Sequence, residues 1–276
     1  MPISARAALT PRQALLLGLA QGPTELLPVS SSAHTTLIPL LLDWPYDELD
    51  GEQRKSFEVA LHAGASVALA IDMRRELLDA ARRLDRRRVS VIVLSLAPAV
   101  LAGAALRSLI ARRLGGPRAI AGGLLGGSAA MSLAELAFDP GERAHDDARA
   151  SDGIALGLAQ AVALAPGVSR YGATLAVARA RGFAHRDAQM LSWHAALPVM
   201  LGASALEAAL LVRRPPPAGA SLPLAVGAAA ALVSTSLSAR LLRRPARALR
   251  SLLPSAAYRV LLAAFVFARL RGRRAQ

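Results

Sequence analysis

The sequence predicts an all-α, polytopic membrane protein with six transmembrane helices and two re-entrant helix hairpins arranged as an inverted repeat. Three observations support this fold: an apolar composition, apolar runs separated by arginine clusters, and two proline- and serine-containing breaks half a chain apart. The 276 residues are 54% hydrophobic, with a mean hydropathy of +0.38. That is too apolar for an ordinary soluble domain, so we treat 1–276 as one integral membrane domain.

The charge pattern favours a membrane protein over a nucleic-acid binder. The formal charge of +14 is one that a nucleic-acid-binding protein could share. However, the arginines cluster between apolar runs and only 4% of the residues are aromatic, so we expect no nucleic-acid partner. The absence of cysteine excludes a disulfide framework and a thiolate site.

The first predicted hairpin surrounds a polar stretch, 21–34, with the sequence Gln-Gly-Pro-Thr-Glu-Leu-Leu-Pro-Val-Ser-Ser-Ser-Ala-His. Its apolar flanks, 14–20 and 35–42, are each shorter than the roughly 20 residues that cross a bilayer. Pro23 and Pro28 are expected to interrupt a continuous helix. We therefore predict a helix–loop–helix that enters the membrane and turns back, with its loop buried in protein or lining a watery cavity.

The other apolar runs predict full spans. The run 89–111 would extend about 34 Å as a helix, enough to cross the bilayer. The expected spans are 57–72, 89–111, 117–138, 190–212, 221–242 and 254–271.

A second interrupted segment, 151–182, is related to the first. The sequence Leu17–Gln21 recurs as Leu156–Gln160, 139 residues later, and the same offset pairs Ser30 with Ser169. This offset is close to half the chain, so we interpret the two segments as a duplication.

The predicted repeats, about 12–138 and 151–271, each contain one hairpin and three spans. Because three is odd, the second repeat is inverted relative to the first, and the two broken segments meet near the midplane. The arginine clusters in 73–88 and 243–250 lie on one face of this arrangement, which we assign to the cytoplasm.

The two breaks carry groups that suit phosphate chemistry. Ser30 and Ser169 each precede a helical run, as N-capping residues do, and two helix N-termini in one cavity favour an anion. Arg170 adds donors that suit phosphate oxygens. Glu25 is either its partner or a ligand for Mg²⁺ or Ca²⁺. His34 can serve as general base or nucleophile, so the set suggests phosphoryl transfer from a membrane-borne substrate.

These residues carry a resemblance to a known family. The stretch 21–34 resembles the glutamate-rich motif of the undecaprenyl-diphosphate phosphatase family, the bacitracin-resistance type. The stretch 166–174 is similar to that family's second motif, Pro-Gly-x-Ser-Arg-Ser-x-x-Thr, and the resemblance covers nearly the whole chain.

The resemblance implies an enzyme of the bacterial inner membrane, with its active site facing the periplasm. It would hydrolyse undecaprenyl diphosphate to the monophosphate, which recycles the lipid carrier for peptidoglycan and gives bacitracin resistance. It also implies a divalent cation, Mg²⁺ or Ca²⁺, and a polyprenyl diphosphate substrate within membrane lipid. The oligomeric state stays open, with a homodimer as one alternative.

The residues expected at the site are those that match positions of the two family motifs. Gln21 falls on an acidic position that is usually glutamate, and Tyr171 replaces the usual serine of the second motif. The expected catalytic residues are Glu25, His34, Ser31 and Arg170; the phosphate-binding residues are Ser30, Ser169, Arg170 and Thr174; and the metal ligands are Glu25 and Gln21.

Two alternatives stay open. Inverted repeats with re-entrant hairpins also occur in transporters, so a transporter or flippase of a polyprenyl phosphate is the second hypothesis. Gln21 and Tyr171 prompt a third, a catalytically impaired paralogue. Among the other titratable residues, His62 and His194 could either line the cavity or simply pack, and Glu58 could either contact the head group or lie at the membrane surface.

Overall fold

A computed structural model describes residues 9–44, 49, 51–139, 141–213, 219–242 and 250–272. Within these ranges the chain is α-helical and contains no named strand, as the composition predicts. The helices are α1 (Pro11–Leu26), α2 (Ser31–Leu41), α3 (Gly51–Asp72), α4 (Arg74–Arg82), α5 (Arg86–Leu114), α6 (Pro117–Leu136), α7 (Ala150–Val162), α8 (Arg170–Ala180), α9 (His185–Arg213), α10 (Ser221–Leu242) and α11 (Leu253–Gly272), with a 3-10 turn, η1, at His145–Asp147.

The described helices support a multi-pass membrane protein but not the full predicted count of spans. Four segments are long and apolar enough to cross a membrane: 86–106 of α5, and helices α6, α10 and α11. A fifth is possible if α3 and α4, which meet at a 67° bend, form one broken span. The expected span at 190–212 forms part of α9, which is not among these candidates, so six spans are not confirmed.

Helix α4 lies within the arginine-rich segment 73–88, which was not among the expected spans. Its nine residues carry three arginines and no buried residue, while Leu77 packs against the core and Leu78 is exposed. Its polar face mixes the arginines with Glu76 and Asp79, so α4 is an amphipathic helix rather than an apolar span.

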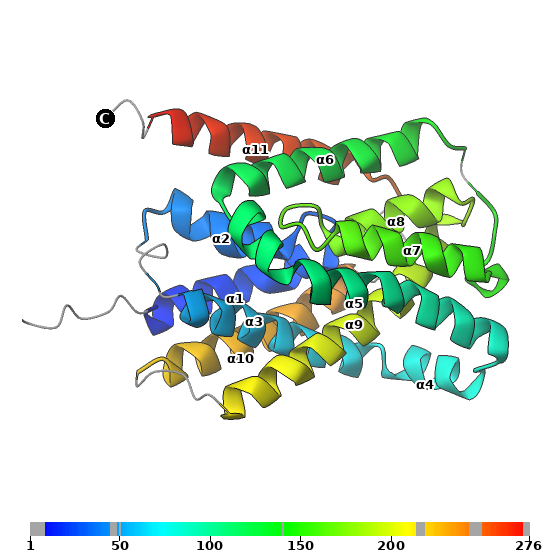
Figure 1. The fold of residues 1–276 in the computed structure, drawn as a ribbon, viewed down its shortest axis with the longest axis horizontal. Helices are drawn as coiled ribbons and strands as arrows, with labels where there is room; N and C mark the ends of the chain where they lie inside the picture. The colour runs from blue at the N-terminus through cyan, green and yellow to red at the C-terminus, as the bar shows by residue number, and fades with distance from the viewer. Residues whose placement is uncertain are drawn as a thin grey trace, which may run out of the picture.

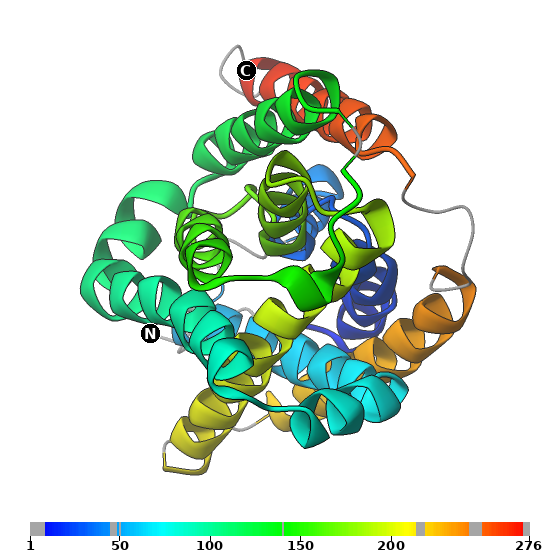
Figure 2. The same ribbon diagram turned by 90° about the vertical axis from the view of Figure 1, so that its right-hand side faces the viewer.

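The two hairpins approach each other from opposite ends of the molecule. In Figure 1, α1 and α2 extend inward from the end where the C-terminus lies, and α7 and α8 extend inward from the other end. Figure 2, seen along the long axis, shows these shorter helices inside a ring of longer ones. Helix α10 packs along α1, and α5 packs along α7. The longer helices thereby hold both hairpin loops in the interior.

The secondary structure repeats with the offset found in the sequence. Helix α8 has the bounds of α2 shifted by 139 residues, from 31–41 to 170–180. The residue before each helix, Ser30 or Ser169, has a positive φ, 76° and 71° respectively. Because a non-glycine residue seldom adopts this conformation, its occurrence at equivalent positions supports the predicted duplication.

Pro23 does not interrupt its helix, contrary to the sequence prediction. It lies inside α1, which continues to Leu26, and the break comes only at 27–30. A proline leaves the carbonyl four residues earlier without its helical donor. Here that carbonyl belongs to Leu19, and the hydroxyl of Ser234 on α10 donates to it at 2.5 Å. Packing between α1 and α10 therefore compensates for the proline.

A buried carboxylate fixes the outer end of the second hairpin. The side chain of Asp152, in the first turn of α7, is fully buried and pairs with Arg143 and Arg181. Burial by itself raises the pKa of Asp152, but hydrogen bonds from Arg143, Arg181 and the Arg149 backbone hold it below its usual value. The stabilisation is thus present above the unfolded-state pKa, about 3.9, and is lost as pH falls through the lower folded-state pKa.

We expect Asp152→Asn to lower the free energy of unfolding by about 3 kcal/mol at neutral pH, because two buried arginine contacts lose their counter-charge. Thermal unfolding in detergent at pH 7 and at about pH 2, below the folded-state pKa of Asp152, measures this. The difference in unfolding free energy between the variant and the wild type should be smaller at the lower pH. An equal difference at both pH values would contradict the electrostatic cause.

Candidate active site

Two serine-capped helix starts form the centre of the candidate site. The hydroxyl of Ser30 accepts from the Ala33 backbone N–H at 3.4 Å, and that of Ser169 accepts from the Gly172 N–H at 3.1 Å. Both serines are buried. Each cap leaves further N–H groups of its first helical turn without an intrahelical partner, and such groups favour a negatively charged ligand.

A polar cluster around one carboxylate, Glu25, lies near the start of α8. Gln21 Nε2 donates to Glu25 Oε2 at 3.0 Å and lies 3.2 Å from His62 Nδ1, which is itself 3.5 Å from Glu25 Oε2. The Glu25 side chain is 11% exposed. Arg170, the first residue of α8, lies near enough for its charge to act on both Glu25 and His62. The first motif therefore meets the second through a pair of opposite charges.

His34 is held from both sides of its ring. Its Nδ1 lies 2.8 Å from the Ser30 carbonyl oxygen, and its Nε2 lies 2.7 Å from the hydroxyl of Tyr258 on α11. Because a carbonyl can only accept, the Nδ1–H donates to it, and in the neutral ring Nε2 is left to accept from the tyrosine hydroxyl. This tautomer leaves a basic nitrogen at Nε2.

The predicted residues thus fall into two groups. Gln21, Glu25 and Arg170 lie together, whereas the hydrogen bonds of His34 go to Ser30 and Tyr258, and these two sets of contacts share no residue.

Two further predicted residues lie in the second helix of a hairpin, Ser31 in α2 and Thr174 in α8. Ser31 begins α2 and is buried. The Thr174 side chain is completely buried, and its hydroxyl donates to the backbone oxygens of Arg170 and Tyr171 at 3.0 and 3.2 Å. Its predicted contact with phosphate would require this hydroxyl to change partners.

The residues at Glu25 suit a hard divalent cation. Gln21 Oε1 is buried and has no hydrogen-bond partner, and it belongs to the same amide group that contacts Glu25. An amide oxygen and a carboxylate are ligands of the type that Mg²⁺ and Ca²⁺ prefer. Across the described part of the chain, no group of three or more His, Asp or Glu side chains could hold a metal ion. A cation here would therefore need oxygens from the substrate or water.

Three further residues enter the site. His62 was left undecided from the sequence, and Tyr258 and Arg259 were not singled out. Tyr258 contacts His34, and Arg259 donates to backbone oxygens of both hairpin loops. The available signal for Arg259 was its position within the apolar run 254–271, where an ionisable residue is a functional candidate.

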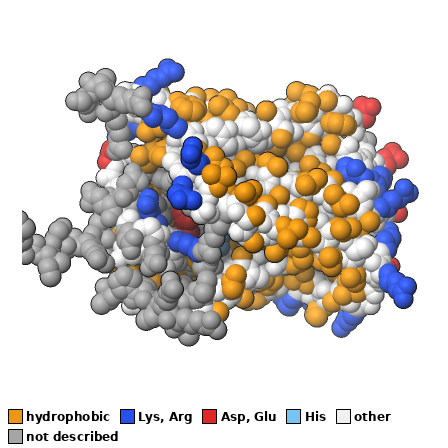
Figure 3. Space-filling view, viewed as in Figure 1, with side chains coloured by type: hydrophobic (Ala, Val, Ile, Leu, Met, Phe, Trp, Pro, Cys, Tyr) orange, Lys and Arg blue, Asp and Glu red, His pale blue; other side chains and the backbone are white. Residues whose placement is uncertain are grey.

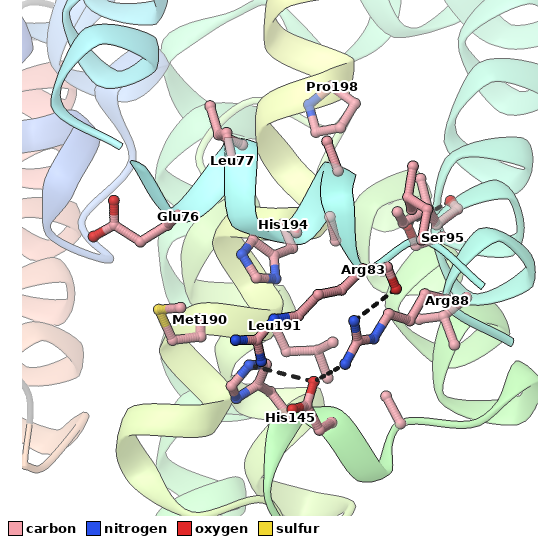
Figure 4. A pocket seen from close by; sticks show the side chains of 18 of the residues that line it. Glu76, Leu77, Arg83, Arg88, Ser95, His145, Met190, Leu191, His194 and Pro198 are labelled. Atoms are coloured by element: carbon pink, nitrogen blue, oxygen red, sulfur yellow. Dashed lines mark hydrogen bonds and ion pairs between the residues drawn. The ribbon is translucent and has the colours of Figure 1, made fainter. Parts of the chain in front are cut away.

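A separate cavity lies away from these residues. It has a volume of about 430 Å³ and is enclosed by α4, α5, α9 and η1 at the end of the molecule that carries the arginines of α4. Figure 4 shows Arg88, His145 and His194 around it. None of the predicted site residues lines this cavity, so His194 faces a different space from Glu25 and His34.

Fold and site together define a class: a multi-pass helical membrane protein in which two serine-capped hairpins meet beside a carboxylate and an arginine. The sequence profile described as "Bacitracin resistance protein BacA" matches residues 14–265, and the chain belongs to this family.

Similar proteins support the same membership. An undecaprenyl-diphosphatase of Pelobacter propionicus is 35% identical, and the match covers 90% of this chain and 93% of the relative. Undecaprenyl-diphosphatases of Geobacter metallireducens and Gemmatimonas aurantiaca are 35% and 36% identical, over 94% and 95% of this chain and 97% and 98% of the relatives. The similarity therefore spans both hairpins and the helices around them.

Proposed function

We propose that this protein is a membrane phosphatase that hydrolyses undecaprenyl diphosphate to undecaprenyl phosphate and inorganic phosphate. The observation that carries this proposal is that Arg170, at the serine-capped start of α8, lies near enough to Glu25 on the other hairpin for their charges to interact, while Arg259 joins both hairpin loops. Family membership and full-length relatives named undecaprenyl-diphosphatase support the same reaction.

In the proposed mechanism, Arg170 and the free N–H groups at the starts of α2 and α8 hold the phosphate oxygens. Their charge and dipoles stabilise the negative charge that develops as the bond between the two phosphates breaks. His34 Nε2 receives the proton of the attacking hydroxyl through the Tyr258 hydroxyl that donates to it. The attacking hydroxyl comes either from water or from Ser31, and in the second case water then hydrolyses the phosphoserine. Glu25 and Gln21 would hold a divalent cation, whose positive charge would offset the negative charge of the diphosphate.

We also propose that the site faces the outside of the inner membrane, with six spans and two inverted hairpins around it. The four to five candidate spans and the repeated element bounds support this arrangement. In Figure 3, basic side chains lie around a few acidic atoms toward the left-hand end of the molecule. A basic rim would attract a diphosphate head group, while the prenyl tail stays in the lipid.

Phosphate release from a C55 prenyl diphosphate by purified protein in detergent tests the function. We expect turnover that depends on Mg²⁺ or Ca²⁺ and stops when the cation is chelated. A folded wild type that binds the lipid without releasing phosphate would contradict the phosphatase. That outcome would instead fit a transporter of the lipid or an impaired paralogue.

We expect Tyr258→Phe to lower kcat about tenfold, the effect of losing one hydrogen bond of roughly 1.4 kcal/mol. The hydroxyl of Tyr258 orients the His34 ring, whereas the diphosphate head group is held by other residues, so KM should change little. Steady-state kinetics across a pH series measures both constants. Unchanged kcat at every pH would show that this contact has no part in the reaction.

A further inference from the structure

Arg259, in the second turn of α11, is an unusual residue for the interior of a membrane protein. It is the largest of the fully buried side chains, with no exposed surface. Its guanidinium contacts neutral acceptors, and no ion pair joins it to any acidic residue in the described ranges. Its Nε is buried without a hydrogen-bond partner. A buried charge without a counter-charge is costly, so this arrangement calls for a functional explanation.

The contacts of Arg259 connect the two hairpins. Nη1 donates to the carbonyl oxygen of Pro28 at 3.1 Å, and Nη2 donates to those of Gly167 and Val168 at 2.8 and 2.9 Å. Pro28 lies two residues before the cap Ser30, and Val168 directly precedes the cap Ser169. One planar group therefore holds both loops immediately before their helices begin.

Helix α6 leaves space for this contact through glycine. A Cβ atom on Gly127 would lie 2.1 Å from Nη2 of Arg259 and 2.5 Å from the Val168 oxygen. Nη2 also donates to the Leu124 carbonyl on α6 at 3.2 Å. By contrast, a Cβ atom on the neighbouring Gly126 would have no atom within 4 Å. The two adjacent glycines thus differ in whether a side chain would displace the guanidinium.

We propose that Arg259 is a positioning residue that couples the two hairpin loops, so that the N-termini of α2 and α8 act on the same phosphate group. Both helix starts can bind one phosphate group only if their N–H groups point at it. A displacement of about 1 Å of such groups greatly lowers the rate of a catalysed reaction. The uncompensated charge of Arg259 adds to the attraction for an anion between the loops. The catalytic part rests on the proposed phosphatase function, whereas the coupling of the loops is a property of the protein without substrate.

The test uses Gly127→Ala, with Gly126→Ala as the matched control, and Arg259→Lys as a second variant that keeps the charge but loses the planar fork. Hydrogen–deuterium exchange of the substrate-free protein in detergent is followed in peptides covering 27–34 and 165–173. We expect Gly127→Ala and Arg259→Lys to increase exchange in both peptides together. Gly126→Ala should leave both unchanged.

Kinetics supply the second measurement. We expect kcat to fall about 100-fold in Gly127→Ala, the cost of displacing groups that must converge on one phosphate. KM should change by less than kcat, because contacts with the prenyl tail are unaffected. Gly126→Ala should retain the wild-type rate.

Several outcomes would overturn the coupling role. Exchange that rises in only one loop, in neither loop, or equally across all helices would show that Arg259 is a local or general structural residue. If Arg259→Lys fails to fold, Gly127→Ala decides the question with the native arginine present. A wild type that does not release phosphate would refute the proposed function, but the exchange result would still decide whether the loops are coupled.

Discussion

Glu25→Gln is expected to reduce kcat/KM at least about 1,000-fold while leaving the protein folded, a loss typical of removing a principal electrostatic group. The glutamine can keep a hydrogen bond with Gln21, which now joins Gln21 Nε2 to Glu25 Oε2 at 3.0 Å. What it removes is the negative charge that lies near Arg170 and that a divalent cation would require. Because glutamine has nearly the shape of glutamate, the size of the loss in kcat/KM reports the contribution of the negative charge of Glu25.

The same variant separates the two roles of Glu25. If the carboxylate holds the cation, raising Mg²⁺ or Ca²⁺ should recover part of the activity, and direct titration should show weaker cation binding. Glu142→Gln is the matched control, because Glu142 is an exposed carboxylate between α6 and α7, in a loop that holds none of the predicted site residues. Retention of full activity by Glu25→Gln would refute both the metal and the catalytic assignment.

The local features of the two breaks could be predicted from sequence because they depend on residues near one another in the chain. Ser30 and Ser169 cap their helices as expected, and the 139-residue offset between the motifs recurs in the bounds of α2 and α8. Capping involves a serine and an N–H three residues later, so short-range sequence is sufficient.

Features that depend on packing were harder to predict. Pro23 was expected to break α1, but Ser234 on α10 satisfies the Leu19 carbonyl that the proline leaves free, across 215 positions of the chain. Arg259 lies in the last apolar helix, and its contacts with Pro28 and Val168 arise only when α11 packs beside both hairpins. A single sequence carries no direct record of such long-range contacts.

Arg170→Lys is expected to lower kcat/KM about 100- to 1,000-fold, although it keeps the positive charge. Arginine offers a planar fork of donors that can hold two phosphate oxygens at once, whereas lysine acts as a point charge. If Arg170 mainly neutralises Glu25, lysine should substitute with little loss. If it clamps phosphate in the transition state, kcat should fall more than KM rises. The ratio of the two changes therefore distinguishes an ion pair from a phosphate clamp.

Arg179→Lys provides the matched control on the same helix. Arg179 is nearly as buried as the caps, and it pairs with Glu135 on α6 rather than with any group at the hairpin loops. We expect this control to lower thermal stability without changing the kcat of the folded fraction. If Arg170→Lys and Arg179→Lys lose kcat equally, the loss comes from replacing any arginine on α8. The assignment of Arg170 as a phosphate clamp would then fail. A loss confined to Arg170→Lys would place the fork of donors at the transferred phosphate, since only there does the geometry of the donors matter more than their charge.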